Sequence, residues 1–259
     1  MAAHEAGHLL DPGATVGPID LRTAYAVQAE GLALRLAAGE RLVGWKIGYT
    51  SAAMRAQMRV DAPNFGPLTD RMLLAGGEPV STALTQPRVE PEILLILGDD
   101  LPGGSDRDRV AHAVGEARGA LEVVDSVWRD YRFRLEDNTA DGSSAAHAVI
   151  GPLLPAGVDL AEVGVTLIGP DGERSEATGA AAFGHPLDAL GWLADALAAQ
   201  GSRLRAGDIV LTGGLTAAVP LPSGARIRAD FAGAGEVSVR REAAVPPSRT
   251  PADTAETGT

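Results

Sequence analysis

The stretch Arg88-Val-Glu-Pro-Glu-Ile-Leu-Leu-Ile-Leu97 constrains the fold of this 259-residue chain more than any other. Residues 93–97 form the longest strongly apolar run in the sequence, which is far too short to span a membrane as a helix and is typical of a buried strand. Alternate side chains of a strand project to the same face, so Glu90 and Glu92 are expected to point together where the buried run begins. Glu122 interrupts a second strand-like segment, residues 121–124, in the same way.

Three carboxylates that meet at the edge of a core repel one another unless a cation lies between them. A hard divalent ion with oxygen ligands fits such a cluster, and Mg²⁺ or Mn²⁺ would leave coordination positions open for water and substrate. The alternative is that these acids edge a solvent-facing strand or pair with Arg88 and Arg118. The spacing alone leaves both interpretations open.

Composition excludes several classes of function. The chain has no cysteine, which removes disulfides, thiolate nucleophiles and cysteine-ligated metals. Its 22 Lys+Arg and 34 Asp+Glu give a net charge of −12, which argues against a nucleic acid or an anionic membrane surface as partner. The sequence contains no segment typical of a signal peptide or a membrane span, so we expect a cytoplasmic protein.

Short strand-like segments dominate the chain after residue 88, and helices are few. Asp20 is a suitable N-cap for a helix that places Leu21, Tyr25, Leu32 and Leu36 on one face and ends at Gly39. Further helices are expected at residues 50–58, from 105 onward and at 186–200, and strands at 42–47, 90–97, 121–124, 148–150, 163–168, 208–211, 225–231 and 236–240. The pattern predicts an α+β fold with a flexible tail at 1–17, a helical N-terminal region at 18–80, a β-rich catalytic core at 81–243 and a disordered tail at 244–259.

Lys46 is the second candidate for chemistry. It lies in Gly-Trp-Lys-Ile-Gly, inside an apolar strand, where a lysine is rare unless it is paired or functional. Desolvation there would make its amine usable as an acid or base, and Asp70, after a Pro/Gly-rich loop, could pair with it. The alternative is a lysine that extends its charged end from the strand into solvent.

Five segments together resemble the hydratase/decarboxylase branch of the fumarylacetoacetate hydrolase superfamily. They are Gly-Trp-Lys-Ile-Gly-Tyr-Thr-Ser, Val-Glu-Pro-Glu with its apolar strand, Leu-Glu-Val-Val-Asp-Ser, Gly-His-Pro-Leu-Asp-Ala-Leu-Gly-Trp-Leu and Gly-Asp-Ile-Val-Leu-Thr-Gly-Gly-Leu-Thr-Ala-Ala-Val-Pro. The resemblance covers residues 20–241 in order. The branch includes 2-hydroxypenta-2,4-dienoate (2-keto-4-pentenoate) hydratases and 4-oxalocrotonate decarboxylases of aromatic catabolism.

The resemblance implies a mixed β-roll core with a helical N-terminal region. It also implies that Glu90, Glu92 and Glu122 bind Mg²⁺ or Mn²⁺, that Lys46 is catalytic and that Asp70 contributes to acid/base work. The residues that it implies for substrate binding are Thr50, Ser143, Ser144, Thr212 and Thr216.

Three positions depart from the pattern of the branch. Gly142 stands where Asn is more frequent, Gly214 where Ser usually follows the Thr-Gly pair, and Ala217 where Gly is usual. Loss of a hydroxyl and an amide would remove polar contacts from the pocket, so an altered substrate is expected.

The function that follows from the resemblance is hydration of a 2-hydroxy-2,4-dienoate to a 4-hydroxy-2-oxo acid, a lyase reaction on a small 2-oxo acid. Decarboxylation of a 4-oxalocrotonate-type acid is the first alternative, and C–C hydrolysis is the second, although it normally needs a water-activating histidine and acid that the sequence does not identify. A non-catalytic partner subunit is the third. The resemblance further implies a homo-oligomer, possible association with a sister enzyme of the pathway, and no nucleic acid or membrane partner.

Two histidine motifs are expected not to bind a metal. His4-Glu-Ala-Gly-His8 has the spacing of a zinc protease, but no periodic helix surrounds it. His185, directly before Pro186, is expected to have a structural role at a turn.

Overall fold

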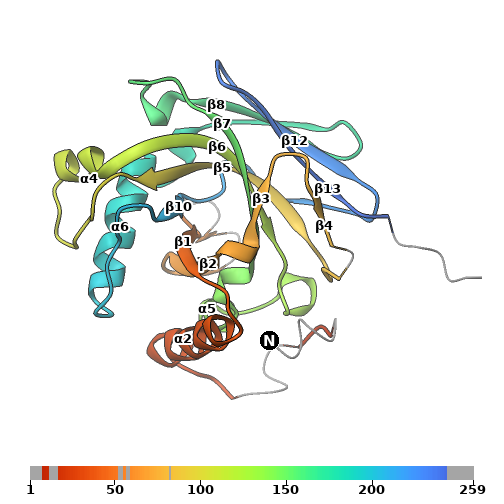
Figure 1. Cartoon of the computed structure of the whole chain (residues 1–259). Helices are drawn as coiled ribbons and strands as arrows, with labels where there is room; N and C mark the ends of the chain where they lie inside the picture. The colour runs from red at the N-terminus through yellow and green to blue at the C-terminus, as the bar shows by residue number, and fades with distance from the viewer. Residues whose placement is uncertain (1–7, 12–16, 52–54, 57–58, 82, 244–259) are drawn as a thin grey trace, which may run out of the picture.

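A large, curved β-sheet contains all three candidate acids and forms the middle of the molecule (Figure 1). The computed structural model describes residues 8–11, 17–51, 55–56, 59–81 and 83–243. The strand order of the large sheet is β2-β1-β10-β5-β6-β7-β3, and β11 pairs with the start of β5. The bounds are β1 Leu42–Gly48, β2 Asn64–Thr69, β3 Leu73–Ala75, β5 Arg88–Leu97, β6 Val114–Val124, β7 Ala145–Leu153, β10 Ile209–Leu211 and β11 Val219–Pro220.

Strand β5 lies in the centre of this sheet because its apolar residues are buried on both faces. It pairs antiparallel with β10 on one side and with β6 on the other. Ile93, Leu94 and Leu95 are all fully buried, which is how a continuous apolar run is accommodated in a covered strand. The expected strand at residues 90–97 is therefore confirmed.

A second sheet packs on β6 and β7 of the large one, and the main core lies between them. Its order is β4-β13-β12-β8-β9, with β4 at Pro79–Val80, β8 at Gly164–Ile168, β9 at Arg174–Thr178, β12 at Arg226–Phe231 and β13 at Gly235–Arg241. Residues of β12 alternate between exposed and buried, as expected for a strand with one covered face. Phe231 at its end is fully buried and occupies the space left by Gly119 of β6, where a Cβ would lie 2.4 Å from the ring.

Four helices pack in two pairs, α2 (Leu21–Ala37) with α5 (Leu135–Ala140) and α4 (Arg107–Ala113) with α6 (Pro186–Ala198). Short 3-10 turns occur elsewhere in the chain, and they are η1 (Asp70–Met72), η2 (Arg129–Tyr131), η3 (Gly142–Ser144), η4 (Leu160–Glu162) and η5 (Gly179–Ala181). Asp20 caps α2 by accepting a hydrogen bond from the Thr23 amide, as its position in the sequence predicts. No helix of the described residues is long and apolar enough to cross a membrane.

The region 18–80 contributes more strand than the sequence suggests. Only α2 is a long helix there, and β1 and β2 pair within the large sheet. Strand β1 also pairs with β10, far along the chain, so the large sheet continues across the expected boundary at residue 81. The reason is that the short apolar segment around Lys46 pairs with β2 on one side and with β10 on the other and does not form part of a layer of helices.

The buried face of α2 is also different from the expected one. Ala24 and Gln28 are its buried residues, whereas Leu36 is 41% exposed. The Gln28 side-chain amide donates to the carbonyls of Phe65 in β2 and Thr139 in α5, at 2.9 and 2.8 Å. Gln28 therefore fixes α2 against the sheet together with Tyr25, a residue of the expected apolar face, whose ring stacks on Phe65 with 4.6 Å between the centroids.

Part of the expected N-terminal tail is bound to the rest of the molecule. The amide of Leu10 donates to the carbonyl of Val127 at 2.7 Å, and the amide of Arg129 donates back to Leu10 at 2.9 Å. Residues 1–7, 12–16 and 244–259 lie outside the described residues, as does much of the expected helix at 50–58.

Candidate active site

Three glutamates of the central strands form one acidic cluster. Glu90 of β5 and Glu122 of β6 are directly paired across the two strands, and Glu92 lies two residues farther along β5 on the same face. One carboxylate oxygen from each residue lies within 4.8 Å of the others. Glu92 and Glu122 are fully buried, and Glu90 is half-buried at the wall of a pocket.

The cluster has the chemistry of a divalent-cation site. Glu92 accepts a hydrogen bond from the Gly213 amide through Oε2 at 2.8 Å, but its Oε1 and the Oε1 of Glu122 have no hydrogen-bond donor among the described residues. Buried carboxylate oxygens without partners are costly, and a hard cation satisfies them all at once. These residues therefore fit Mg²⁺ or Mn²⁺.

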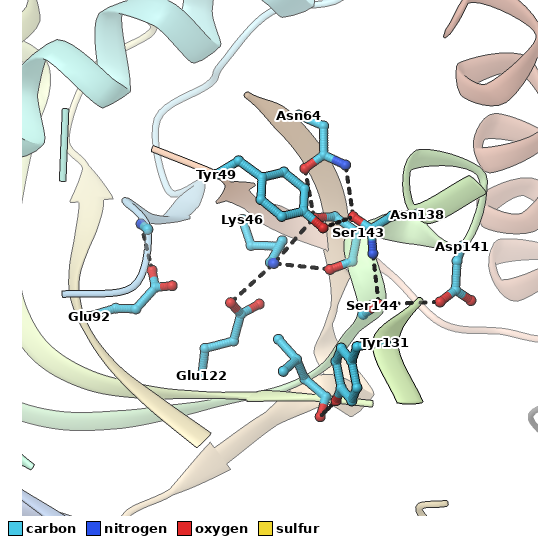
Figure 2. Close-up of polar contacts among 12 residues, drawn as sticks. Lys46, Tyr49, Asn64, Glu92, Glu122, Tyr131, Asn138, Asp141, Ser143 and Ser144 are labelled. Carbon is cyan, nitrogen blue, oxygen red and sulfur yellow. Dashed lines mark hydrogen bonds and ion pairs between the residues drawn. The ribbon is translucent and has the colours of Figure 1, made fainter. Parts of the chain in front are cut away.

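Lys46 lies on β1, two strands away from β5 in the same sheet, and its side chain points toward this cluster (Figure 2). Its Nζ lies 3.1 Å from Glu122 Oε2 and donates to the carbonyl of Ser143 at 3.0 Å and to the Ser143 hydroxyl at 3.3 Å. The side chain is 4% exposed, so the lysine does not extend into solvent. The structure thus brings together the four residues that the sequence singles out, Lys46 and the three acids.

Burial and mutual repulsion shift the ionisation of these groups. Burial, and then the neighbouring Glu122, raise the pKa of Glu90 to about 8, although Lys46 opposes the shift. The same causes, together with Glu90, raise the pKa of Glu92 well above its usual range. For Lys46, burial favours the neutral amine, but the carboxylates of Glu122, Glu90 and Glu92 outweigh it and raise its pKa. Lys46 therefore carries its proton at neutral pH.

A network of buried polar side chains fixes the loop that faces Lys46 (Figure 2). The Ser143 hydroxyl donates to Asn64 Oδ1 at 2.9 Å, and Asn64 Nδ2 donates to Asn138 Oδ1 at 3.0 Å. Asn138 also accepts from the Tyr49 hydroxyl at 2.9 Å and donates to the Ser144 hydroxyl at 2.8 Å. Sequence analysis did not identify Tyr49, Asn64 or Asn138, because they come from three separate segments that only the fold brings together.

Most non-glycine residues with a positive φ, among those described, lie at this pocket. Of the seven described non-glycine residues with positive φ, five line this pocket, and they are Tyr49, Asp130, Tyr131, Ser143 and Ser144. Such conformations are unfavourable for residues with a Cβ and are retained where the surroundings enforce them, often at functional sites. Their clustering here is independent support for a functional pocket.

The pocket has a polar end at the acids and a more apolar end beyond them. Ser143, Ser144 and Thr50, all implied as substrate-binding residues by the family resemblance, line it. The other end is lined by Arg88 and by a group of mainly apolar or aromatic residues, Val124, Tyr131, Phe133, Ala217 and Ala218. The sequence suggests Arg88 as an alternative ion-pair partner of the acids, but the described residues show no ion pair between Arg88 and an acid.

Asp70 does not reach this site. It accepts from the Arg41 amide and guanidinium at 2.9 and 3.0 Å, and these contacts lower its pKa. Strand β2 pairs Gly66 with Lys46 and then runs away from the pocket, so four residues later the chain is about 13 Å farther along. The expected pairing of Asp70 with Lys46 is wrong.

Two implied substrate-binding threonines are also directed elsewhere. The Thr212 hydroxyl donates to the carbonyl of Ile93 at 2.9 Å and is fully buried between β10 and β5. The Thr216 hydroxyl donates to the Ala217 carbonyl at 3.2 Å, and neither threonine lines the pocket. Both stabilise the chain that approaches the acids instead of contacting the cavity.

The departures at Gly142 and Gly214 have conformational explanations. Gly142 has a φ of +70°, a left-handed conformation that glycine and asparagine tolerate best, and it lies outside the lining of the catalytic pocket. A Cβ at Gly214 would lie 2.2 Å from Glu90 Oε2, so glycine leaves room for that carboxylate in its present position. Ala217 lines the apolar end of the pocket.

Of the two histidine motifs, the one at His185 is fully described. His185 caps α6 by accepting from the Leu187 amide at 3.0 Å, which confirms its structural role. The His4-Glu-Ala-Gly-His8 motif lies outside the described residues except for His8, which is exposed.

Comparison with known proteins agrees with the geometry. The family model described as fumarylacetoacetate (FAA) hydrolase, C-terminal, matches residues 42–240. The chain belongs to this family. The match spans β1 to β13 and contains the acidic cluster and Lys46, so the resemblance inferred from the motifs is confirmed.

Proteins with similar sequences are named as hydratases, which are hydro-lyases. The 2-keto-4-pentenoate hydratase of Burkholderia vietnamiensis is 42% identical over 238 residues, covering 87% of this chain and 90% of that protein. The 2-hydroxyhexa-2,4-dienoate hydratase of Comamonas testosteroni is 37% identical over 223 residues, covering 84% of each. These comparisons support the expected class of enzyme, a lyase.

A solved structure extends the similarity to the whole fold. The 4-oxalocrotonate decarboxylase from Pseudomonas putida G7, complexed with magnesium and adipate, superimposes with a TM-score of 0.88 at 33% identity and covers 93% of each chain. The expected α+β fold with a mixed β-roll core is therefore confirmed.

Proposed function

We propose that this enzyme is a divalent-metal-dependent hydratase that converts a 2-hydroxy-2,4-dienoate into a 4-hydroxy-2-oxo acid. The observation that carries the proposal is the contact between Lys46 Nζ and Glu122, next to a pocket that Lys46 and Glu90 line and behind which Glu92 and Glu122 complete the acidic cluster. The names of the hydratase relatives supply the reaction, and the buried acids and lysine supply groups suited to it.

Glu90, Glu92 and Glu122 would hold the ion, and we propose Mg²⁺ or Mn²⁺. A bound ion of this kind would polarise the 2-oxo group of the substrate and offset negative charge that develops on it. The unpartnered oxygens of Glu92 and Glu122 support this assignment. A relative of known structure contains magnesium, and its similarity extends over the whole chain.

Lys46 is proposed as the residue that moves protons. In the reaction, the 2-hydroxyl loses a proton and C5 gains one, which leaves a C3–C4 double bond conjugated to the ketone. Water then adds its oxygen to C4 and a proton to C3. In this proposal Lys46 enters the sequence as an ammonium, donates a proton to C5 and recovers one from the 2-hydroxyl, so the lysine returns to its starting protonation state.

Thr50, Ser143 and Ser144 are proposed to contact the substrate from the pocket wall. Ser143 holds Lys46 through its carbonyl and hydroxyl, so it orients the amine as well. The network through Asn64 and Asn138 keeps this loop in place before substrate enters, and such preorganisation favours catalysis.

The decisive assay follows the ultraviolet absorbance of 2-hydroxypenta-2,4-dienoate with purified protein and Mg²⁺. We expect the dienol to disappear and 4-hydroxy-2-oxopentanoate to form, and we expect EDTA or Lys46→Ala to abolish turnover. Turnover that continues unchanged in EDTA or in the Lys46→Ala variant would contradict the mechanism.

Decarboxylation is the second candidate, favoured by the 0.88 TM-score to the 4-oxalocrotonate decarboxylase. Release of CO₂ from 4-oxalocrotonate without hydration of the dienoate would select it. C–C hydrolysis is disfavoured because no histidine of the described residues lines the pocket. The intact lysine and acids argue against a non-catalytic partner subunit.

We also propose a homo-oligomer, as the family resemblance implies. Val27 and Leu34 of α2, seven residues apart on one helix, are 49% and 57% exposed and could be covered by a second subunit. A monomer in sedimentation velocity at micromolar concentration would contradict this.

A further inference from the structure

The pocket contains a cation that the hydration reaction does not use. Arg88 lines the end of the pocket remote from Glu92, and its Cζ lies 4.3 Å from the ring centroid of Tyr131. Arg88 forms no ion pair or hydrogen bond through its side chain with any described residue, and it is only half-buried. Its charge is therefore free to meet a ligand.

The aromatic surface under Arg88 is rigid. The Tyr131 hydroxyl donates to the carbonyls of Gln86 and Val124 at 3.1 and 3.0 Å. Buried Asp125 in turn accepts from the Gln86 amide at 2.7 Å, which anchors the segment directly before Arg88. A guanidinium stacked on a fixed ring is preorganised, so it loses little conformational entropy when it binds a planar anion.

The position of Arg88 relative to the acids defines what it could contact. On β5 it lies two residues before Glu90, on the same face, so the two Cα atoms are about 7 Å apart. Arg88 is paired across the sheet with Val124, whereas Glu90 is paired with Glu122. Arg88 is thus within reach of a ligand whose head group is held at the acids and whose chain extends along β5.

Few charged side chains lie close to Arg88. Val124, Phe133, Ala217 and Ala218 line this end of the pocket and carry no charge. Asp130 is the one acid of the described residues at this end, and its carboxylate is 70% exposed and lies 3.4 Å from Arg132. A carboxylate on the ligand would satisfy the guanidinium through two parallel hydrogen bonds.

We propose that Arg88, supported by Tyr131, binds a second carboxylate at the distal end of the substrate. This assignment rests on the proposed function and narrows it, because the preferred substrates become dicarboxylic 2-hydroxydienoates and 2-oxo acids. A monocarboxylic substrate would leave the arginine without a charged partner at this end of the pocket.

The test uses two ligands that differ only in the distal carboxylate and cannot undergo hydration, 2-oxohexanoate and 2-oxohexanedioate. Calorimetry in saturating Mg²⁺ should show that the wild-type enzyme binds the dicarboxylate at least about tenfold more tightly, as expected for charge-assisted hydrogen bonds. In Arg88→Met this preference should disappear, while binding of 2-oxohexanoate changes less than about threefold. Arg88→Lys, which keeps the charge but not the planar fork, should retain part of the preference.

Arg228→Met is the matched control, since Arg228 lies on β12 of the second sheet and pairs with Glu236. It should leave the preference intact. Equal weakening of both ligands in Arg88→Met would overturn the proposal, because it would mean that Arg88 binds the shared head group. A wild-type enzyme that hydrates 2-hydroxypenta-2,4-dienoate but does not prefer the dicarboxylate would overturn this proposal and leave the proposed function standing. A protein that binds neither ligand and does not turn over the dienoate would overturn both.

Discussion

At the scale of residues, the site is built from a pairing that a sheet normally avoids. Glu90 and Glu122 face each other directly across β5 and β6, and like charges in such positions destabilise a sheet. Lys46 offsets only one of the three carboxylates, and the raised pKa values of Glu90 and Glu92 show that the other two do not ionise freely without a further positive charge. The arrangement makes physical sense as a binding site whose missing charge comes from a cation.

Replacement of Glu92 by Gln should therefore abolish metal binding. The amide keeps the shape of the side chain and its contact with the Gly213 amide but removes the charge. Mutations of groups that only support a metal ligand cost 10–100-fold in affinity, so loss of a ligand should weaken Mg²⁺ binding by at least about 100-fold. Calorimetric titration measures this directly. Glu116→Gln, at an exposed position of β6, is the control, and unchanged Mg²⁺ affinity in Glu92→Gln would remove Glu92 from the ligand set.

The raised pKa of Glu90 predicts how the metal-free protein responds to pH. Its pKa is about 8 in the folded state against an ordinary value of 4.5, so folding favours the protonated form. That stabilisation is complete below about pH 4.5 and is lost as the pH rises through about 8. Urea unfolding in EDTA should show that the free energy of unfolding falls between these limits more steeply for the wild type than for Glu90→Gln. Parallel curves for the two proteins would show that Glu90 ionises normally.

The sequence identified the acids and Lys46 because each is a charged residue inside a short apolar segment, a local signal. Asp70 was assigned on nearness in the chain, and the direction of β2 takes it away from Lys46. Asn64 and Asn138 gave no local signal at all, since an asparagine is common in loops. Their roles depend on contacts between segments 74 residues apart.

At the scale of elements, three short segments hold Lys46 in place. Strand β2 supplies Asn64, helix α5 supplies Asn138, and turn η3 supplies Ser143, whose carbonyl accepts from Lys46. Gly66 allows β2 to approach η3, because a Cβ there would lie 2.0 Å from the Gly142 carbonyl. The position of the turn is thus set by the neighbouring elements, and not by its own sequence.

Asn138→Ala should damage both stability and catalysis. It removes the acceptor for the Tyr49 hydroxyl and the donor to Ser144, and buried groups left without partners typically cost about 1–3 kcal/mol. Denaturant unfolding should show that the free energy of unfolding falls by this amount. The kcat should also fall, because the turn η3 that holds Lys46 shifts. Tyr49→Phe removes one hydrogen bond of the same network and should have a smaller effect on stability. Wild-type kcat in Asn138→Ala would mean that η3 is held without this network.

Elements with a local signature were predicted well, and elements defined by pairing were not. Helix α2 begins at a capping Asp, and helix α6 begins at a Pro and repeats apolar residues with helical period. Strand β6 begins at Val114, seven residues before the expected strand, because Gly115 and Gly119 hide its pattern. Pairing with β5 along its length overrides the low strand propensity of that segment.

At the scale of the whole molecule, the acidic cluster is located where its occupancy affects the entire fold. Strands β5 and β6 are the longest in the large sheet and share an extended register, and the second sheet packs on β6 and β7. Repulsion between Glu90 and Glu122 therefore acts on the middle of the structure. A ligand at the cluster should stabilise the protein globally instead of ordering one loop.

Mg²⁺ should accordingly raise the melting temperature. A ligand that binds only the folded state stabilises it by about 2.7 kcal/mol at 100 times its Kd, and each kcal/mol corresponds to roughly 2–4 °C for a chain of this size, so an increase of about 5–10 °C is expected. Calorimetric melting with and without Mg²⁺ measures the shift, and Glu92→Gln should melt at the same temperature in both. Because β5 and β6 carry the ligands, amide exchange in these central strands should slow by the same free energy as the global shift. Slower exchange confined to the pocket loops, with no change in melting temperature, would show that the cation orders only the site and that the central strands tolerate the paired acids unaided.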